Sequence, residues 1–210
     1  MVKITTVIAA LVMASALVNA DTIIVDDDGP ADFSTIQAGI DAAVPGDVVL
    51  VQPGGYIEAI DFLGKTITVR SAEGALLTSI KAPPDAERPT VTFASKEGST
   101  AKLSGFKIGG GSGRIIDDPI FGPILAGGGI FCFESYPEIS NCELVANSIE
   151  GHGAGMLVMR GSPDISECTF VQNAATGHGG AIYILDNASP RITSCTFHEN
   201  SGSWGGAITC

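Results

Sequence analysis

Three stretches of the sequence repeat one another: GGIFCFESYPEISNCELVAN (128–147), AGMLVMRGSPDISECTFVQN (154–173) and GAIYILDNASPRITSCTFHEN (180–200). Each copy presents an apolar run, a proline, an isoleucine, a cysteine, a large apolar residue and an asparagine in the same order. Ile130, Met156, Ile182 and Ile208 are each 26 residues apart. A period of this length indicates stacked structural units rather than one globular core.

Each repeat predicts one coil of short β-strands. Glycine and proline interrupt the repeat at every break, and β-branched runs of a few residues lie between them. Strand alternation places Cys142 and Leu144 inside and Glu143 outside. Stacking such coils at about 4.8 Å brings equivalent residues into ladders. The expected fold is therefore all-β, a single-stranded parallel β-helix with clear 26-residue rungs from about residue 128.

Two ladders of equivalent residues are expected to be structural. One consists of Cys142, Cys168 and Cys195, and the other of Asn147, Asn173 and Asn200. Five cysteines in an exported chain are compatible with disulfides, but this spacing favours buried free thiols that pack as small apolar groups, with Cys132 and Cys210 in a second column. The asparagines are expected at a turn, where their amides satisfy backbone groups.

The N-terminal region predicts an export signal followed by a cap. Residues 1–20 combine one lysine, an apolar core and a small-x-small exit, which is typical of a signal peptide, although an uncleaved anchor is the alternative. The β-helix domain then covers residues 21–210, with a cap at about 21–47. Within it, Ser34 and Gln37 form a candidate capping box at the start of a short helix that covers the first coil. The expected location is secreted, periplasmic or on the cell surface.

Composition narrows the classes of partner. The formal net charge of −12 disfavours nucleic acid and anionic membranes as partners. No apolar segment beyond the signal region is long enough for a membrane span. Because Cys210 falls three residues into a new strand, we expect the native protein to continue beyond it.

The chain resembles pectin-lyase-like β-helix proteins, including pectin methylesterases, in four stretches: DFSTIQ (32–37), IDAA (40–43), GD (46–47) and VQPGGY (51–56). It also resembles the polymorphic outer-membrane protein repeat in GGAI (179–182 and 205–208), FVQN (170–173) and FHEN (197–200). These resemblances imply a right-handed β-helix, and the second implies an adhesin or passenger module. The paired catalytic aspartates and the glutamine of pectin methylesterases have no matching motif in this sequence.

Some residues suggest chemistry on polysaccharides. An acidic pair, a Gly-His-Gly and an Arg-Ile resemble polygalacturonase motifs and give four candidate catalytic residues: Asp117, Asp118, His178 and Arg191. Hydrolysis needs one carboxyl group to protonate the leaving oxygen and another to activate water. However, His178 lies 26 residues after His152 and so fits a repeating turn. A lyase would instead need Ca²⁺, for which residues 26–28 (DDD) form a dense acidic run that we interpret as a solvated turn; no metal or cofactor is otherwise expected.

An apolar patch is the remaining candidate site. If Ile130, Met156 and Ile182 point inward, then Phe131, Leu157 and Tyr183 point outward. Such a patch can stack sugar rings, dock another chain, or lie beneath the inserted loop at 109–127, and we favour the last of these.

The sequence thus predicts an exported β-helix module for surface display, adhesion or carbohydrate contact, without catalysis of its own. Its partners would be a polysaccharide or a surface protein. The alternative is a polysaccharide-degrading enzyme, pectate-lyase-like or polygalacturonase-like.

Overall fold

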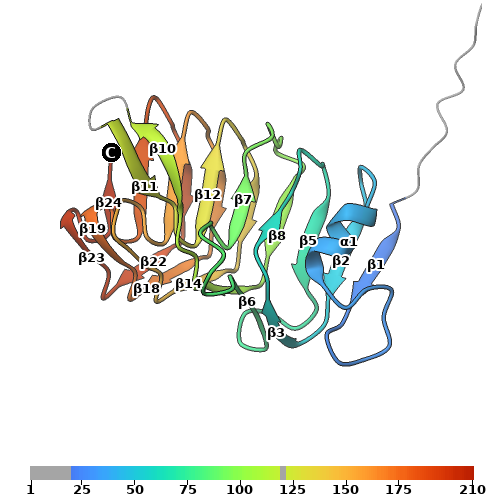
Figure 1. Ribbon diagram of the computed structural model, residues 1–210. Helices are drawn as coiled ribbons and strands as arrows, with labels where there is room; N and C mark the ends of the chain where they lie inside the picture. Colours follow the sequence, from blue (N-terminus) through green and yellow to red (C-terminus); the bar gives the residue numbers. More distant parts are fainter. Residues whose placement is uncertain (1–19, 119–121) are drawn as a thin grey trace, which may run out of the picture.

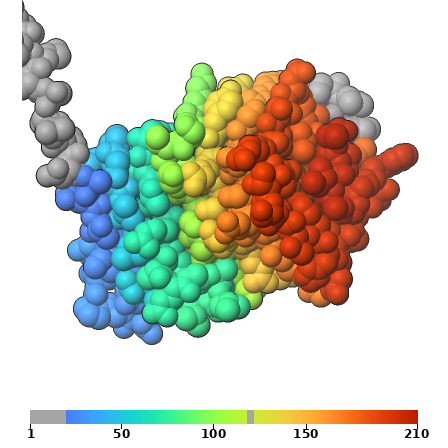
Figure 2. Space-filling view, turned by 180° about the vertical axis from the view of Figure 1, so that it is seen from behind, coloured from blue at the N-terminus to red at the C-terminus, as the bar shows by residue number. Residues whose placement is uncertain are grey.

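The computed structural model describes residues 20–118 and 122–210, except for the side chain of residue 118. These residues wind into a right-handed parallel β-helix whose coils follow one another along a single axis (Figure 1). Seen from behind, successive segments form bands from one end of the molecule to the other (Figure 2). The predicted fold is confirmed, whereas the predicted signal peptide lies almost wholly outside the described residues.

Three long parallel sheets form the walls of the described part of the chain. Sheet A contains β1 (Thr22–Val25), β2 (Val48–Val51), β5 (Thr68–Ser71), β8 (Lys102–Ser104), β13 (Glu138–Ser140), β17 (Asp164–Ser166) and β21 (Arg191–Thr193). Sheet B contains β3 (Gly54–Ile57), β6 (Thr78–Lys81), β9 (Lys107–Gly109), β14 (Glu143–Val145), β18 (Thr169–Val171) and β22 (Thr196–His198). Sheet C contains β4 (Ile60–Asp61), β7 (Val91–Phe93), β12 (Ile130–Phe133), β16 (Met156–Met159), β20 (Ile182–Leu185) and β24 (Ile208–Thr209).

Two smaller elements join these walls. The short sheet contains β15 (Ser148–Ile149), β19 (Ala174–His178) and β23 (Ser201–Trp204). The hairpin consists of β10 (Arg114–Asp118) and β11 (Gly122–Ala126). None of the helical segments in the described part of the chain has the length and apolarity of a membrane span.

Residues that are one 26-residue repeat apart in the sequence pair with each other in the β-helix. In sheet C, Ile130 pairs with Met156, Met156 with Ile182 and Ile182 with Ile208. The side chains alternate as predicted, because Leu144 and Phe170 are fully buried while Glu143 points outward. The rings of Phe170 and Phe197 stack with centroids 4.9 Å apart, so one large apolar side chain supports the next along the core.

Each coil bends sharply between sheets A and B. The bend is made by a residue with positive φ, namely Asn141, Glu167 or Ser194 in the three repeats. Gly105, with φ of 81°, occupies the same place one coil earlier. Gly105 therefore separates β8 from β9.

The asparagine ladder is confirmed as a structural device. Asn173 Nδ2 donates to the Leu144 carbonyl at 2.8 Å and to Asn200 Oδ1 at 2.9 Å. Asn173 Oδ1 accepts from both the backbone N–H and Nδ2 of Asn147, at 3.2 and 2.9 Å. Each amide thus satisfies buried backbone groups of its neighbouring coils, which would otherwise cost about 1–3 kcal/mol each.

The five cysteines are free thiols. Cys132, Cys142 and Cys168 are buried as predicted, and burial raises the pKa of the Cys132 thiol. The prediction of burial is wrong for Cys210, which is exposed, and Cys195 is only half-buried, because both lie in the last coil.

Helix α1 (Ile36–Ala42) packs against β1, β2 and β4 at one end of the core, as the cap prediction required. The predicted capping box is corrected: Thr35, not Ser34, is the N-cap, and its hydroxyl accepts from the N–H of Ala38. The first N–H groups of the helix bind the Glu58 carboxylate instead, from Ile36 at 2.8 Å and Gln37 at 2.9 Å. A carboxylate at this position also interacts favourably with the helix dipole.

Candidate functional site

The inserted segment is a β-hairpin, which corrects its prediction as an irregular loop. Strand β10 pairs antiparallel with β11, in register from Arg114 opposite Ala126 to Asp118 opposite Gly122. The hairpin is anchored to the β-helix where the N–H of His152 donates to the Leu125 carbonyl at 2.9 Å. Asp117 therefore lies on a strand of this hairpin, contrary to the expectation that it lies in a loop.

The hairpin covers the outward apolar patch of sheet C, as we favoured from the sequence. Phe131, Leu157 and Tyr183 do point outward, but they are only 2%, 0% and 4% exposed. Ile116 and Ile124 of the hairpin pack against them. A ligand therefore reaches this patch only beside the hairpin, where the cover ends.

An open cleft of about 510 Å³ lies at that edge. It is bordered by one strand of the hairpin and by sheet C, with these lining residues: Ala94, Arg114, Ile115, Ile116, Asp117, Phe131, Phe133, Met159 and Arg160. We refer to it as the hairpin cleft. Its lining combines aromatic and aliphatic groups with exposed charges, as in sites that bind small molecules or sugar units.

Two arginines lie over two phenylalanine rings in the hairpin cleft. The Cζ atom of Arg114 is 4.9 Å from the centroid of the Phe131 ring, and that of Arg160 is 5.7 Å from the centroid of Phe133. The two rings are themselves stacked, with centroids 6.3 Å apart. These contacts hold the guanidinium groups at the surface, with N–H donors available to a ligand.

The two arginines differ in their partners. Arg160 pairs with Asp186 and, at 3.8 Å, with Glu134. Arg114 forms no salt bridge within the described residues, although it is exposed at the cleft wall. Arg114 is therefore the cation that is available to an acidic group of a ligand.

Asp61 is a carboxyl group on this face that sequence reasoning missed. It pairs in register with Thr92 on sheet C, and it lines a neighbouring cleft of about 280 Å³ that also includes Arg88 and Arg114. Desolvation by burial raises the pKa of Asp61, while the hydrogen bond from the Leu63 N–H acts in the opposite direction. A carboxyl group with a raised pKa in a cleft is a candidate acid, but structural networks produce such shifts too.

The polygalacturonase-like residues are not brought together. Asp117 lies on the hairpin above sheet C, His178 ends β19 in the short sheet, and Arg191 begins β21 in sheet A. The side chain of Asp118 is outside the described part of the structure. These residues therefore do not form one catalytic constellation.

His178 and Arg191 have structural surroundings of their own. His178 stacks between His152, at 4.9 Å, and Trp204, at 5.9 Å between ring centroids, so the Gly-His-Gly motif forms a ladder of rings. Arg191 pairs with Asp164 at 2.9 Å on the outer face of sheet A, next to the pair of Lys102 with Glu138 at 2.6 Å. Such exposed pairs contribute about 0.2–1 kcal/mol, as on an ordinary solvated face.

The acidic run at residues 26–28 forms a bend whose carboxylate oxygens lie within 4.8 Å of one another. Two of these oxygens accept backbone hydrogen bonds at 3.3 Å: Asp26 Oδ1 from the N–H of Asp28, and Asp27 Oδ2 from the N–H of Gly55. Asp27 and Asp28 are exposed, in keeping with the interpretation as a solvated turn.

A solved pectin methylesterase shares the fold. The carrot enzyme aligns with a TM-score of 0.58 at 17% identity, over 90% of this chain and 56% of its own length. This chain thus spans little more than half of that enzyme. Two others align with TM-scores too low to bear on the fold: an enzyme variant in complex with a hexasaccharide (0.45, 13% identity, 82% of this chain and 66% of that one) and the Aspergillus niger enzyme (0.39, 12%, 90% and 89%).

Sequence comparisons identify the family but no functional relative. Among curated proteins, none matches the chain significantly. The model of the right-handed β-helix region matches residues 84–209, which is more than half of the sequence. The chain therefore belongs to the right-handed β-helix family.

Proposed function

We propose that this protein is an exported β-helix module that binds an acidic polysaccharide in the hairpin cleft without degrading it. The observation that carries the proposal is the pairing of each phenylalanine ring with an arginine at an open cleft, by Arg114 over Phe131 and Arg160 over Phe133. Surface display or adhesion would follow from holding such a polymer. The resemblance to polymorphic outer-membrane repeats and the signal-like residues 1–20 support an exported location.

The chemistry of the cleft suits a uronate-containing polymer. A guanidinium group can donate two parallel hydrogen bonds to a carboxylate, and Phe133, the partly exposed ring of the cleft, offers an apolar surface to the C–H face of a sugar. Although the chain carries a formal net charge of −12, its distant charges are screened beyond about 8 Å at physiological ionic strength. The local cation Arg114 therefore decides whether a carboxylate binds.

Binding of oligogalacturonate by isothermal titration calorimetry tests this proposal. We expect the wild-type chain to bind and Arg114→Gln to weaken binding about tenfold, which corresponds to about 1.4 kcal/mol. Arg191→Gln is the matched control, since it removes the same charge from the outer face of sheet A. Absence of binding by the wild-type chain, or an Arg114→Gln variant that binds equally well, would contradict the proposal.

A second candidate function is polysaccharide degradation, and the raised pKa of Asp61 favours it. In that case Asp61 would act as the acid and the nearby cations Arg88 and Arg114 would position the substrate. Under a lyase mechanism Ca²⁺ would also be required. Turnover that is abolished by Asp61→Asn, with binding retained, would establish this alternative.

A further inference from the structure

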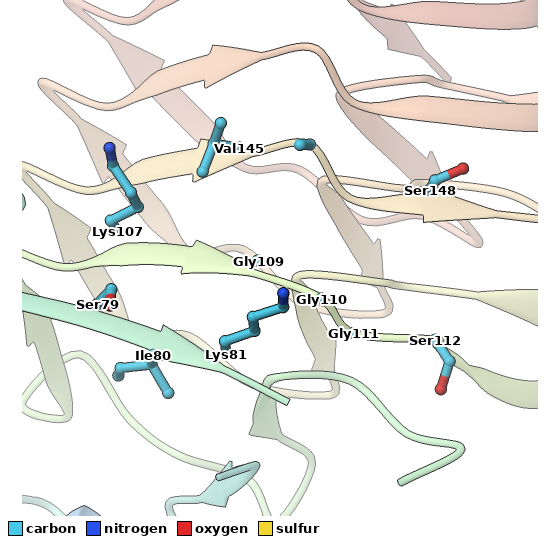
Figure 3. Close-up of a pocket in the computed structure, with 11 residues that line it drawn as sticks. Ser79, Ile80, Lys81, Lys107, Gly109, Gly110, Gly111, Ser112, Val145 and Ser148 are labelled. Carbon is cyan, nitrogen blue, oxygen red and sulfur yellow. The ribbon is translucent and has the colours of Figure 1, made fainter. Parts of the chain in front are cut away.

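A second cleft lies on a different wall, at the edge of sheet B. Its volume is about 540 Å³, and these residues line it: Ser79, Ile80, Lys81, Lys107, Gly109, Gly110, Gly111, Ser112, Val145, Ala146 and Ser148 (Figure 3). We call it the lysine cleft. Its lining contains two lysines and three serines but no acidic residue, in a chain where acidic residues outnumber basic ones by 23 to 11.

A missing side chain explains why a cleft exists there. Gly109 pairs in register with Lys81 on one side. On the other side it lies level with Val145, because the preceding residues Ile108 and Leu144 are paired. Between two outward side chains, glycine therefore leaves a gap in the column. Immediately afterwards the chain leaves the wall to form the hairpin, and the short sheet begins only with β15 in the next coil.

Lys81 is held in this cleft without a charged partner. A Cβ atom on Gly110 would lie 2.7 Å from Lys81 Cγ and 3.1 Å from its Cε, so the aliphatic stem of the lysine packs directly on the glycine backbone. Figure 3 shows the side chain extending toward this backbone. Lys81 forms no salt bridge within the described residues, although the chain is rich in carboxylates.

Lys107 supplies a second positive charge on the neighbouring strand. It pairs in register with Ser79, two residues from Lys81, and its ammonium group is 3.4 Å from Glu143 at the rim. Because side chains alternate along each strand, the two lysines project from the same outer face of neighbouring strands, which are about 4.8 Å apart. Glu143 already compensates part of the Lys107 charge, so Lys81 is the ammonium group left for an external anion, with Lys107 beside it.

We propose that the lysine cleft binds a tetrahedral oxyanion, a sulfate or phosphate ester carried by a polymer. Ammonium groups act as point charges and suit a tetrahedral anion, whereas the fork of an arginine suits a planar carboxylate. Ser79, Ser112 and Ser148 line the same cleft and add neutral hydroxyl donors along it. The site is separate from the hairpin cleft and does not depend on the function proposed for it.

The site is tested by measuring how tightly the full chain binds dextran sulfate and polyphosphate. Uncharged dextran serves as the blank. We expect at least one polyanion to bind, with an affinity that falls as salt rises, and the better of the two identifies the ester. Lys81→Ala should weaken binding about tenfold, since it removes a hydrogen bond from a charged group. Ala146→Asp should weaken it as strongly, because it places a negative charge at the exposed mouth of the cleft and leaves both lysines intact.

Lys102→Ala is the matched control, because it removes the same charge from sheet A. Lys102→Ala and Arg114→Gln should both leave polyanion binding unchanged, whereas Arg114→Gln should impair oligogalacturonate binding. If neither polyanion binds the wild-type chain, or if Lys102→Ala weakens binding as much as Lys81→Ala, the lysine cleft is not an oxyanion site.

Discussion

The two halves of this β-helix share the same three long sheets but space the strands of these sheets differently in the sequence. In residues 128–210, neighbouring strands of sheet A are nearly equally spaced in sequence, from Glu138 to Asp164 and from Asp164 to Arg191. In residues 20–109 the spacing is uneven, since Val48 pairs with Thr68 but Thr68 pairs with Lys102. The walls need aligned strands, but the turns between them can vary in length.

The halves also satisfy their buried polar groups differently. The C-terminal half repeats one solution, the asparagine ladder. The N-terminal half uses individual ones: Glu97, although completely buried, accepts from the N–H of Gly64 at 2.8 Å, the N–H of Ser95 at 3.0 Å and the hydroxyl of Ser135 at 2.7 Å. A repeated device is visible in a sequence, whereas a device used once is not.

Core truncations should have the largest effect and should show whether the halves share one core. Phe93 packs against Phe62 in the N-terminal half, with the ring centroids 4.2 Å apart, and Phe170 stacks on Phe197 in the other half. We expect Phe93→Ala and Phe170→Ala each to lower the free energy of unfolding by about 3–5 kcal/mol. Urea denaturation followed by circular dichroism should show one shifted transition for each variant. A transition that shifts for only half of the signal would mean that the halves unfold separately.

Removing a central asparagine should have the next largest effect and should distinguish the regular half. Asn173→Ala removes the amide that binds the Leu144 carbonyl and the Asn147 N–H inside the core, so we expect a loss of about 2 kcal/mol in urea denaturation. Asn200→Ala should cost less, because Asn200 is only half-buried and water can replace its amide. Equal losses for the two variants would contradict a role that depends on burial.

The smallest expected effect concerns acid stability of the N-terminal half. The backbone N–H groups of Val44 and Asp21 hold the pKa of Asp47 below its ordinary value. A lowered pKa in the folded state stabilises the protein above the unfolded value of about 3.9, and this contribution is lost as the pH falls through the folded pKa. Asp47→Asn should therefore be less stable than wild type at pH 6, with the difference shrinking below about pH 4 in urea denaturation. A difference that is independent of pH would contradict this cause.

The regular half explains how much of the fold was predictable. Exact spacing of Ile130, Met156 and Ile182 gave the strand register directly, and alternation gave the buried face. The hairpin was missed because its two strands pair with each other rather than with the repeat, and one of them contains Pro123.

The candidate site was less predictable than the fold. Arg114 and Arg160 lie far apart in sequence and meet only because the hairpin folds over sheet C. The apolar patch was recognised, but the hairpin covers it and leaves only the neighbouring Phe133 partly exposed. Asp61 lies in the same column of outward side chains as Thr92 and Phe131. It was missed because the 26-residue repeat does not extend to that part of the sequence.

The central claim is that this chain holds an acidic polysaccharide without cutting it. It is tested most directly by incubating the purified chain with polygalacturonate, with and without Ca²⁺, and measuring in one sample both the polymer bound and the new chain ends released. The account predicts bound polymer and no new ends. Release of new ends that is lost in Asp61→Asn or Asp117→Asn would contradict it and identify the chain as an enzyme.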